Sequence, residues 1–261
     1  MVSQINGSVV NAFRILELFQ PGTDQITAAT LVARLGMNAI TAHRFLRTLE
    51  LTGALVAVSR GGYQLGYALA DLGERAASQR NLTTVVQPVL KALTNDVNEG
   101  SMVTNFDGEM AVCIARAVPA RTLFVDIKIG SRLEAYCTAN GKLWLAHLTP
   151  EQWALYLDKV SMDPMNDITA QTADSLQRDL AEIRATGVSY NRGEREPEIQ
   201  AVGVAAMSRT GRMICGVSIF GPTGRLTPEK LDSYIAPLQA AARKIETALY
   251  GPPPEILTKT K

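Results

Sequence analysis

The chain has few residues that bind metals or form disulfide bonds, with three cysteines and two histidines among its 261 residues. Cys113, Cys137 and Cys215 lie far apart and lack CxxC spacing. An odd, scattered set of this kind is a poor disulfide framework, and with only His43 and His147 to add imidazole it is a poor zinc site. We therefore expect three small buried thiols, no metal site and no cofactor.

Long apolar runs are also absent. A membrane-spanning helix needs roughly 18 or more consecutive apolar residues, and the N-terminal stretch VVNAFRILELF is interrupted by polar residues at helical spacing. Nothing in this stretch resembles a signal peptide. Since 46% of the residues are hydrophobic and 20% are charged, we expect a globular, soluble, cytoplasmic protein of one large or two ordinary domains, with no membrane partner.

Catalytic signatures are missing from the chain, which contains no GxSxG element, P-loop, HExxH motif or dinucleotide fingerprint. Cys137 and His147 could form a nucleophile and base pair, but nothing in the sequence orients them and their spacing matches no motif. We expect no catalytic residue and no enzymatic activity.

The chain also lacks a large excess of positive or negative charge, because the net charge is only +1. Residues 1–80 hold seven arginines, no lysine and five acids, a charge of +2 that leaves −1 for the remainder. Four of those arginines fall within residues 31–60, where Glu50 is the only acid. A local basic face on a nearly neutral chain is compatible with salt-sensitive phosphate contacts that dimerisation reinforces.

This basic segment contains a candidate recognition helix, TAHRFLRTLEL, over residues 41–51. Coiled as a helix, it places Thr41, Arg44 and Thr48 on one side. The opposite, apolar stripe consists of Ala42, Leu46 and Leu49, broadened by Phe45. One face of the helix can therefore be buried while the other meets a ligand.

The residues before this helix predict a helix-turn-helix. LVARLGMN is typical of a short helix that ends at Leu35, with Gly36 as a left-handed C-cap and Asn38 as the N-cap of the next helix. The second helix of such a motif enters the DNA major groove. Two amphipathic helices joined by a glycine turn also occur in all-α proteins that never contact DNA, so the flanking segments decide between the two interpretations.

The flanking segments complete a winged helix. Ser8 predicts the N-cap of a first helix that runs to about residue 19, and Thr27 that of the second. After Gly53, the runs ALVAV and YQL flank a Gly-Gly turn and predict a hairpin. Arg60 at its tip would reach the phosphate backbone or the minor groove, or else be a solvated loop residue. The buried stripe of the first helix is predicted to be Val9, Ala12, Phe13, Leu16 and Phe19.

Three segments resemble the isocitrate lyase regulator (IclR) family of bacterial transcription factors. TAHRFLRTLELTGAL followed by YQLG resembles the family's S/T-x-HR-LL-x-TL-x-x-G-x-L core and Y-x-LG motif. IGSRLEAYCTANGKLWLA over 129–146 resembles its G-x-R-x-x-x-x-x-x-A-x-GK-x-x-LA signature, and GVSIFGPTGRLT over 216–227 resembles its S-x-x-GP-x-x-RL strand and turn. The matches occur in order and span nearly the whole chain. The chain departs from the pattern at Asn11, Glu198 and Ala205, where the family usually has Arg, Gly and Pro.

The resemblance implies an α+β protein in three parts. A winged helix-turn-helix DNA-binding domain occupies residues 1–66, a linker helix 67–81 and a GAF-like effector-binding domain 82–261. The residues themselves support this division, because an amphipathic helix predicted from Tyr67 is followed by a break and a new helix cap at Asn81. Beyond it, the apolar runs SMVTNF, AVCIARAV and LFVDIKIG predict strands, followed by helices near 140–148, 151–158 and 172–185, strands near 199–208 and 213–220, and a long closing helix over 228–250.

In the second domain, Ala139, Asn140 and Gly141 would open a helix whose unpaired N–H groups and dipole favour a carboxylate. The resemblance implies an effector pocket built from this turn, the adjacent strand and the two C-terminal strands, with Asn191 and Ser218 as polar anchors. Carried over by motif position, its lining is Val125, Leu133, Ala139, Asn140, Gly141, Asn191, Ile199, Ala201, Ser218 and Phe220.

Each part of this pocket has an alternative interpretation. The apolar members could equally be plain core, and Gly141 could serve packing alone. Phe220 stands where a small residue is common in the family, so it would shrink the cavity or favour a flat ligand. The charged run over 192–198 is predicted to be a solvated loop able to act as a lid.

The sequence therefore predicts a transcription regulator, repressor or activator, controlled by a small organic, carboxylate-bearing effector. Arg44 is the strongest candidate for a bidentate guanine contact, whereas His43 could instead pack against the neighbouring helix. Because one winged helix of this charge buries little surface, we expect a homodimer, or a dimer of dimers, on a palindromic operator in double-stranded DNA. The predicted DNA-contacting residues are Asn38, Thr41, His43, Arg44, Arg47 and Arg60.

Two other functions are compatible with the same residues. The winged helix could serve protein contacts in a sensor module that does not bind DNA. Alternatively, the GAF-like half could act as an enzyme. DNA binding that depends on Arg44 separates the regulator from the sensor module.

Overall fold

The computed structural model describes residues 5–20, 22–79, 81–169 and 173–251, without the side chains of Arg60 and residues 77–79. Its internal contacts divide the chain into two compact units, Met1–Arg80 and Asn81–Lys261. Each unit has its own hydrophobic core.

The first unit consists of three helices, a hairpin and a fourth helix. In chain order these are α1 (Gly7–Leu16), α2 (Ala28–Leu35), α3 (Ala39–Leu51), β1 (Leu55–Ala57), β2 (Tyr63–Leu65) and α4 (Ala68–Gln79). The strands β1 and β2 pair antiparallel, and Ile26 adds an isolated bridge to Tyr63. This arrangement is a winged helix-turn-helix, which confirms the predicted fold class.

Short-range hydrogen bonds decide where α2 and α3 begin. Thr27 caps α2 in a reciprocal capping box, and the Asn38 side chain accepts a hydrogen bond from the first turn of α3. Gly36 ends α2 with a φ of 67°, in the left-handed region. These three predicted caps are confirmed, whereas α1 is capped by Asn6 and not by Ser8.

The predicted burial of α1 is wrong for two of its five residues, since Ala12, Leu16 and Phe19 pack against the core but Val9 and Phe13 do not. Val9 and Phe13 are 53% and 64% exposed, while Ile15 is completely buried. The helix is apolar on more than one side, and the core of the unit takes the side that carries Ala12, Ile15 and Leu16. An apolar stripe on the outer side of α1 therefore remains uncovered.

The second unit is built on a six-stranded sheet with the strand order β5-β4-β3-β8-β7-β6, in which every neighbouring pair is antiparallel. The strands are β3 (Gly100–Phe106), β4 (Met110–Ala117), β5 (Arg132–Glu134), β6 (Val188–Arg192), β7 (Ile199–Met207) and β8 (Met213–Pro222). The helices are α5 (Leu82–Val97), α6 (Ala139–Ala146), α7 (Pro150–Lys159), α8 (Ala173–Thr186), α9 (Pro228–Ser233) and α10 (Ile235–Tyr250).

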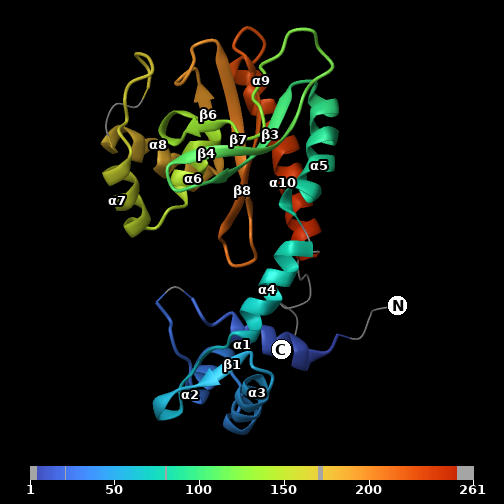
Figure 1. Cartoon of the computed structure of the whole chain (residues 1–261), viewed down its shortest axis with the longest axis vertical. Coiled ribbons are helices and arrows are strands. Elements are labelled where there is room, and N and C mark those ends of the chain that lie inside the picture. Colours follow the sequence, from blue (N-terminus) through green and yellow to red (C-terminus); the bar gives the residue numbers. More distant parts are fainter. Residues whose placement is uncertain (1–4, 21, 80, 170–172, 252–261) are drawn as a thin grey trace. The chain divides into compact units, whose positions relative to one another are not determined.

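Helices cover both faces of this sheet (Figure 1). The helices α5 and α10 pack on one face, where Val217 and Ile219 of β8 join the core. Side chains alternate along a strand, so Gly216, Ser218 and Phe220 point to the opposite face. The helix α6 lies over this second face, which also carries the cavity.

Three parts of the second unit differ from the predicted elements. The run LFVDIKIG forms no strand, because Arg116 donates to the carbonyl oxygen of Ile127 at 2.9 Å and holds the segment as a loop in which Leu123 is 74% exposed. The strand β6 was not expected, since its polar residues obscure any apolar alternation. The predicted closing helix is interrupted at Tyr234, which separates α9 from α10.

The three cysteines are buried and unpaired, as the sequence predicts. Burial raises the pKa of Cys113 to about 11 and those of Cys137 and Cys215 to about 12, so these thiols stay protonated at neutral pH. Among the described residues, no group of three or more His, Cys, Asp and Glu side chains is arranged to hold a metal ion. None of the described helices is long and apolar enough to cross a membrane.

Candidate functional site

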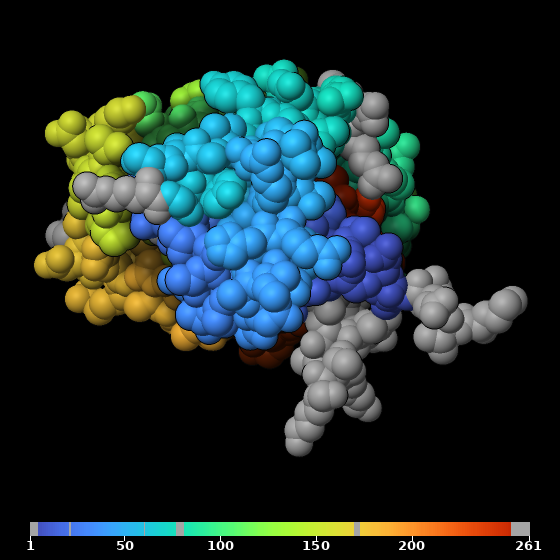
Figure 2. Space-filling view, turned by 90° about the horizontal axis from the view of Figure 1, so that it is seen from below, coloured from blue at the N-terminus to red at the C-terminus, as the bar shows by residue number. Residues whose placement is uncertain are grey.

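The outer face of α3 is the first candidate site. His43 and Arg44 are exposed on it, while the predicted apolar stripe on the other side is buried. The Arg44 side chain has no hydrogen bond or ion pair within the part of the chain that the structure describes. In the space-filling view the segment that contains α3, coloured sky blue as the bar shows near residue 50, lies uncovered at the front (Figure 2). The helix thus presents an unpaired guanidinium to an outside partner.

The other predicted DNA-contacting residues are constrained in different ways. Arg47 is exposed, but its guanidinium pairs with Glu50 at 2.8 Å within the helix. Asn38 uses Oδ1 to cap α3, and Thr41 is half-buried. Arg60 lies in the 3-10 turn between β1 and β2, and its side chain is outside the described part of the structure.

A cavity of about 350 Å³ on the α6 side of the sheet is the second candidate site. Its size falls within the range of about 300–1,000 Å³ that is typical of small-molecule sites. Seven of the ten predicted pocket residues line it, namely Val125, Leu133, Ala139, Asn191, Ile199, Ala201 and Phe220. Eight further lining residues were not predicted, namely Met102, Asp126, Ile127, Ser131, Arg132, Thr138, Arg195 and Glu196. Four of these, Asp126, Ile127, Arg195 and Glu196, lie in loops outside the family motifs. Ser131, Arg132 and Thr138 lie within the motif over 129–146, next to predicted pocket residues, so their place in the sequence could have suggested them.

The helix α6 begins at the wall of this cavity. Thr138, at its N-cap position, donates its hydroxyl hydrogen to the Glu134 carbonyl oxygen at 2.7 Å, and no side chain caps the helix. The first backbone N–H groups of α6 therefore lack an acceptor from the helix or from a cap. Because Thr138 and Ala139 both line the cavity, the positive end of the helix dipole borders it, where an anion would be stabilised.

The arginines of the cavity wall are already paired with acids. Arg132 pairs with Asp107, and Arg195 donates from Nε to Glu134 Oε2 at 2.6 Å and from Nη1 to Glu196. Although burial lowers the pKa of Arg195, the hydrogen bond and charge of Glu134 raise it above its ordinary value. These side chains keep their charge and orientation, so the start of α6 supplies the uncommitted donors.

Three predicted pocket residues lie outside the cavity. Asn140 and Ser218 are completely buried, and the amide atoms of Asn140 and the hydroxyl of Ser218 have no partner among the described residues. A Cβ added at Gly141 would come within 2.3 Å of the Ala135 Cα, so this glycine lets α6 pack closely on the short 3-10 helix η2 (Ala135–Cys137). For Gly141, the packing alternative is the one that the geometry supports.

The predicted polar anchors also differ in their surroundings. Asn191 lines the cavity, but its Oδ1 accepts hydrogen bonds from Gly193 N at 3.0 Å and Glu194 N at 2.9 Å. Its NH2 group remains for a ligand, as a donor only. Ser218 pairs with Met102 across β8 and β3, but it does not line the cavity. Met102 and Phe220 form the cavity wall there.

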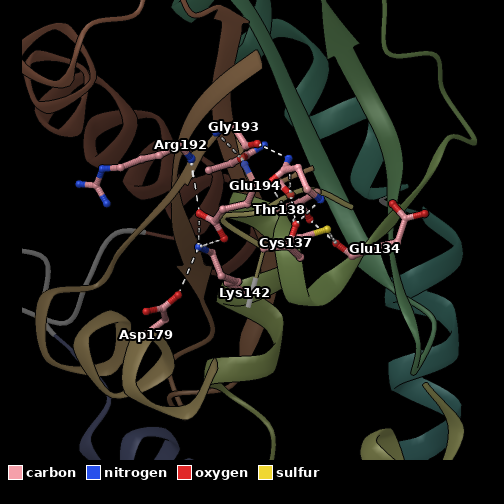
Figure 3. A network of polar contacts seen from close by, with 11 residues as sticks. Glu134, Cys137, Thr138, Lys142, Asp179, Arg192, Gly193 and Glu194 are labelled. Atoms are coloured by element: carbon pink, nitrogen blue, oxygen red, sulfur yellow. Dashed lines mark hydrogen bonds and ion pairs between the residues drawn. The ribbon is translucent and has the colours of Figure 1, made fainter. Parts of the chain in front are cut away.

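The charged run over 192–198 is only partly the solvated segment that the sequence predicts, because Arg192 and Glu198 are exposed but Glu194 is buried. Glu194 is only 9% exposed, and both of its carboxylate oxygens accept hydrogen bonds from Lys142 Nζ, at 2.7 and 2.6 Å (Figure 3). Lys142, on α6, is itself 4% exposed. Asn166 and Thr169 donate to the Glu194 carbonyl oxygen. The loop that brings Arg195 to the cavity is therefore fixed to α6.

Two family models match this chain, one in each unit. The model described as the IclR helix-turn-helix domain matches residues 8–59. The model described as the bacterial transcriptional regulator IclR C-terminal domain matches residues 74–247. The second match alone covers more than half of the chain.

Individual proteins resemble the chain along nearly its whole length. The probable transcriptional regulator SauR of Cupriavidus necator is 27% identical over 244 residues, which cover 93% of this chain and 96% of SauR. The crystal structure of the Thermotoga maritima IclR is 25% identical, with a TM-score of 0.62 over 94% of this chain and 99% of that one. An IclR homolog from Microbacterium hydrocarbonoxydans, crystallised in complex with 4-hydroxybenzoate, has the same fold at 23% identity, with a TM-score of 0.58 over 94% of this chain and 100% of that one.

Proposed function

The chain belongs to the IclR family of bacterial transcriptional regulators, and we propose that α3 reads operator DNA while the cavity beside α6 holds the effector. The protein is a DNA-binding regulator whose operator affinity is modulated by a small molecule. The observation that carries our assignment of the reading surface is the unpaired Arg44 on the exposed face of a helix whose other face is fully buried.

Arg44 and His43 are the side chains that we assign to base edges. A guanidinium can donate two parallel hydrogen bonds to guanine O6 and N7, and Arg44 has no partner among the described residues to give up first. Arg47 is assigned to a phosphate, since its pair with Glu50 is exposed and exchanges at little cost. Asn38 and Thr41 at the start of α3, and Arg60 in the wing, would contact the backbone of the duplex.

The effector is proposed to carry a carboxylate, bound at the start of α6. The N–H groups there are uncapped, and the NH2 group of Asn191 adds a further donor. Leu133, Ile199 and Phe220 give the rest of the cavity an apolar wall that suits an aliphatic or aromatic body. Seven of the ten residues assigned to the pocket by the resemblance line this cavity, which supports the proposal.

A homodimer is proposed because the outer side of α1 is apolar and uncovered. Val9 and Phe13 are spaced four residues apart on α1 and are 53% and 64% exposed, and Ile5, just before the helix, is 47% exposed. An exposed apolar stripe of this kind marks a protein contact more often than a functionless surface. Two copies would read the two halves of a palindrome, and α4, as the linker between residues 67 and 81, would transmit effector binding to their spacing.

No catalytic role is proposed. Burial raises the pKa of Cys137 to about 12, and Nδ1 of His147 lies 2.8 Å from the Leu143 carbonyl oxygen. A protonated, buried thiol is not a nucleophile at neutral pH, so this residue pair does not support the enzyme alternative. We place the protein in the cytoplasm, where bacterial operator DNA lies.

The test of the reading surface is the affinity of Arg44→Ala for DNA taken from upstream of the neighbouring genes. Loss of a bidentate base contact costs about 1–3 kcal/mol, so Kd should rise roughly 5- to 150-fold. Arg75→Ala, which removes the same charge from exposed α4, is the matched control and should bind within about twofold of wild type. Fluorescence anisotropy at several salt concentrations measures both constants.

The salt series separates two roles for Arg44. A base contact leaves the slope of log K against log salt nearly unchanged, whereas loss of a phosphate contact reduces the slope by about one. Unaltered binding by Arg44→Ala would contradict our assignment of α3 as the reading surface.

A further inference from the structure

We infer that the second unit contains a second ligand site, separate from the effector cavity, that takes an amphiphilic aromatic anion. The site is a cavity of about 520 Å³, which is within the range of about 300–1,000 Å³ for small-molecule sites. It lies between the turn that joins β3 and β4, the C-terminal end of α6, the helix α7 and the start of β8.

An aromatic wall gives this cavity its shape. The rings of Phe106 and Trp144 stack with centroids 5.9 Å apart and planes 15° from parallel. Trp144 Nε1 donates to Thr104 Oγ1 at 3.4 Å, which satisfies the indole N–H and fixes the ring. Leu148 and Met213 extend the apolar surface. A flat apolar ligand can therefore bury one face against an ordered surface.

The charges of this cavity are all of one sign and are uncompensated. Lys159 and Arg212 line it with exposed side chains, and neither forms an ion pair within the described ranges. No Asp or Glu belongs to the described lining. In the effector cavity, by contrast, Arg132 and Arg195 are each matched to an acid. Two free cations beside an apolar wall favour a ligand with a carboxylate or sulfonate at one end.

The position of this cavity makes it independent of the first. Both lie on the same face of the sheet, but Ala139 at the start of α6 lines the effector cavity, whereas Trp144 and His147 at its end line the second. Likewise Met102 of β3 lines the first and Phe106 lines the second. The two cavities thus lie at different ends of α6 and of β3, and each has its own lining residues.

The experiment is calorimetric titration of the full-length protein with 2-naphthoate, an aromatic carboxylate, and with 2-naphthylmethanol, its uncharged counterpart. Wild type should bind 2-naphthoate at two sites per chain and the alcohol at no more than one. In Lys159→Gln/Arg212→Gln the second site should weaken by roughly tenfold or more, as loss of hydrogen bonds to charged groups does, while the first site keeps its affinity. Both substituted side chains are exposed, so the fold should be retained.

The control is Lys91→Gln/Arg178→Gln, which removes two exposed cations from α5 and α8 and should leave both sites unchanged. Binding of 2-naphthoate that Lys159→Gln/Arg212→Gln leaves unchanged overturns the inference, whether wild type shows one site or two. A single wild-type site that is lost in this variant would support the inference and count against the effector cavity. A second site that weakens as protein concentration rises would assign the cavity to contact with another copy of the chain and would also overturn it. Operator affinity is not measured in this titration, so failure here leaves the DNA assignment standing.

Discussion

Lys142 and Glu194 are the two residues that connect the walls of the effector cavity. Lys142 lies on α6, whose first N–H groups border the cavity, and Glu194 lies in the loop that brings Arg195 to it. Two oppositely charged groups that are both nearly buried hold each other firmly, because each would otherwise be an uncompensated charge away from water. The pair therefore sets the distance between the first N–H groups of α6, which we propose bind the effector carboxylate, and the opposite wall of the cavity.

This connection predicts a specific pattern of stability. Lys142→Met should lower the free energy of unfolding by about 3–5 kcal/mol, since it leaves the buried Glu194 carboxylate without its cation. Glu194→Leu should cost somewhat less, because Lys142 keeps the half-exposed Asp179 at 3.7 Å. The double variant Lys142→Met/Glu194→Leu should be more stable than either single variant, because no buried charge remains. Urea unfolding followed by circular dichroism gives the three values and their coupling.

The control for this cycle is Glu198→Leu, an exposed acid four residues beyond Glu194, which should change stability by less than about 0.5 kcal/mol. A double variant that is less stable than both singles would mean that the pair does not act as a unit. Affinity for an effector should fall in the single variants, since the loop and α6 are no longer held together.

Some of these residues could be predicted from the sequence and others could not. Exposure of Arg44 follows from helical spacing within a few residues, and the position of Ala139 at the start of a helix follows from the local sequence. Burial of Lys142 cannot be predicted in this way, because its partner is 52 positions away in the chain. For the same reason the loop around Glu194 resembles a solvated charged run until the fold brings α6 to it.

At the scale of elements, the predictable ones are those that local contacts define. The starts of α2 and α3 depend on a capping side chain and its own first turn, so their sequences specify them. The strand β6 depends on pairing with β7, and residues 123–130 are held as a loop by Arg116 of β4. Neither the pairing of β6 with β7 nor the contact with Arg116 can be predicted from a short stretch of the sequence.

The helix α6 gives the prediction at this scale. Gly141→Ala should lower the melting temperature of the second unit by several degrees, because the new methyl group would meet the Ala135 Cα at 2.3 Å and its carbonyl oxygen at 2.5 Å. Both are backbone atoms, so α6 must move and its first N–H groups move with it. Affinity for a carboxylate effector should therefore fall as well.

Gly224→Ala is the matched control, since a Cβ there meets nothing within 4 Å. Differential scanning calorimetry of the two variants measures the difference in melting temperature. Equal melting temperatures would show that the contact between α6 and η2 relaxes without cost, and the start of α6 would then not be held by close packing.

At the scale of the whole chain, the near absence of net charge bears on how the regulator binds DNA. The chain carries +1 overall and only +2 over residues 1–80, so long-range attraction to DNA is weak and a single copy depends on the few phosphate contacts that its local basic face can make. A dimer makes twice as many contacts with DNA as one copy, while the charge of each copy stays the same.

The resemblance of three motifs in order could be recognised from the sequence, but the outer stripe of α1 could not, because the sequence predicts Val9 and Phe13 to be buried.

This difference provides the last prediction. Phe13→Glu places a charge in the middle of the exposed apolar stripe of α1, where it should disrupt contact between copies while leaving each fold intact. Sedimentation velocity should show a shift from dimer to monomer, and operator affinity should fall by about tenfold or more as the second half-site contact is lost. Effector affinity should not change, because the cavity lies wholly within the second unit.

The matched control is Leu123→Glu, which charges a leucine that is 74% exposed in the second unit and should leave the dimer intact. If Phe13→Glu still sediments as a dimer, the contact between copies lies elsewhere, and the apolar stripe of α1 needs another partner.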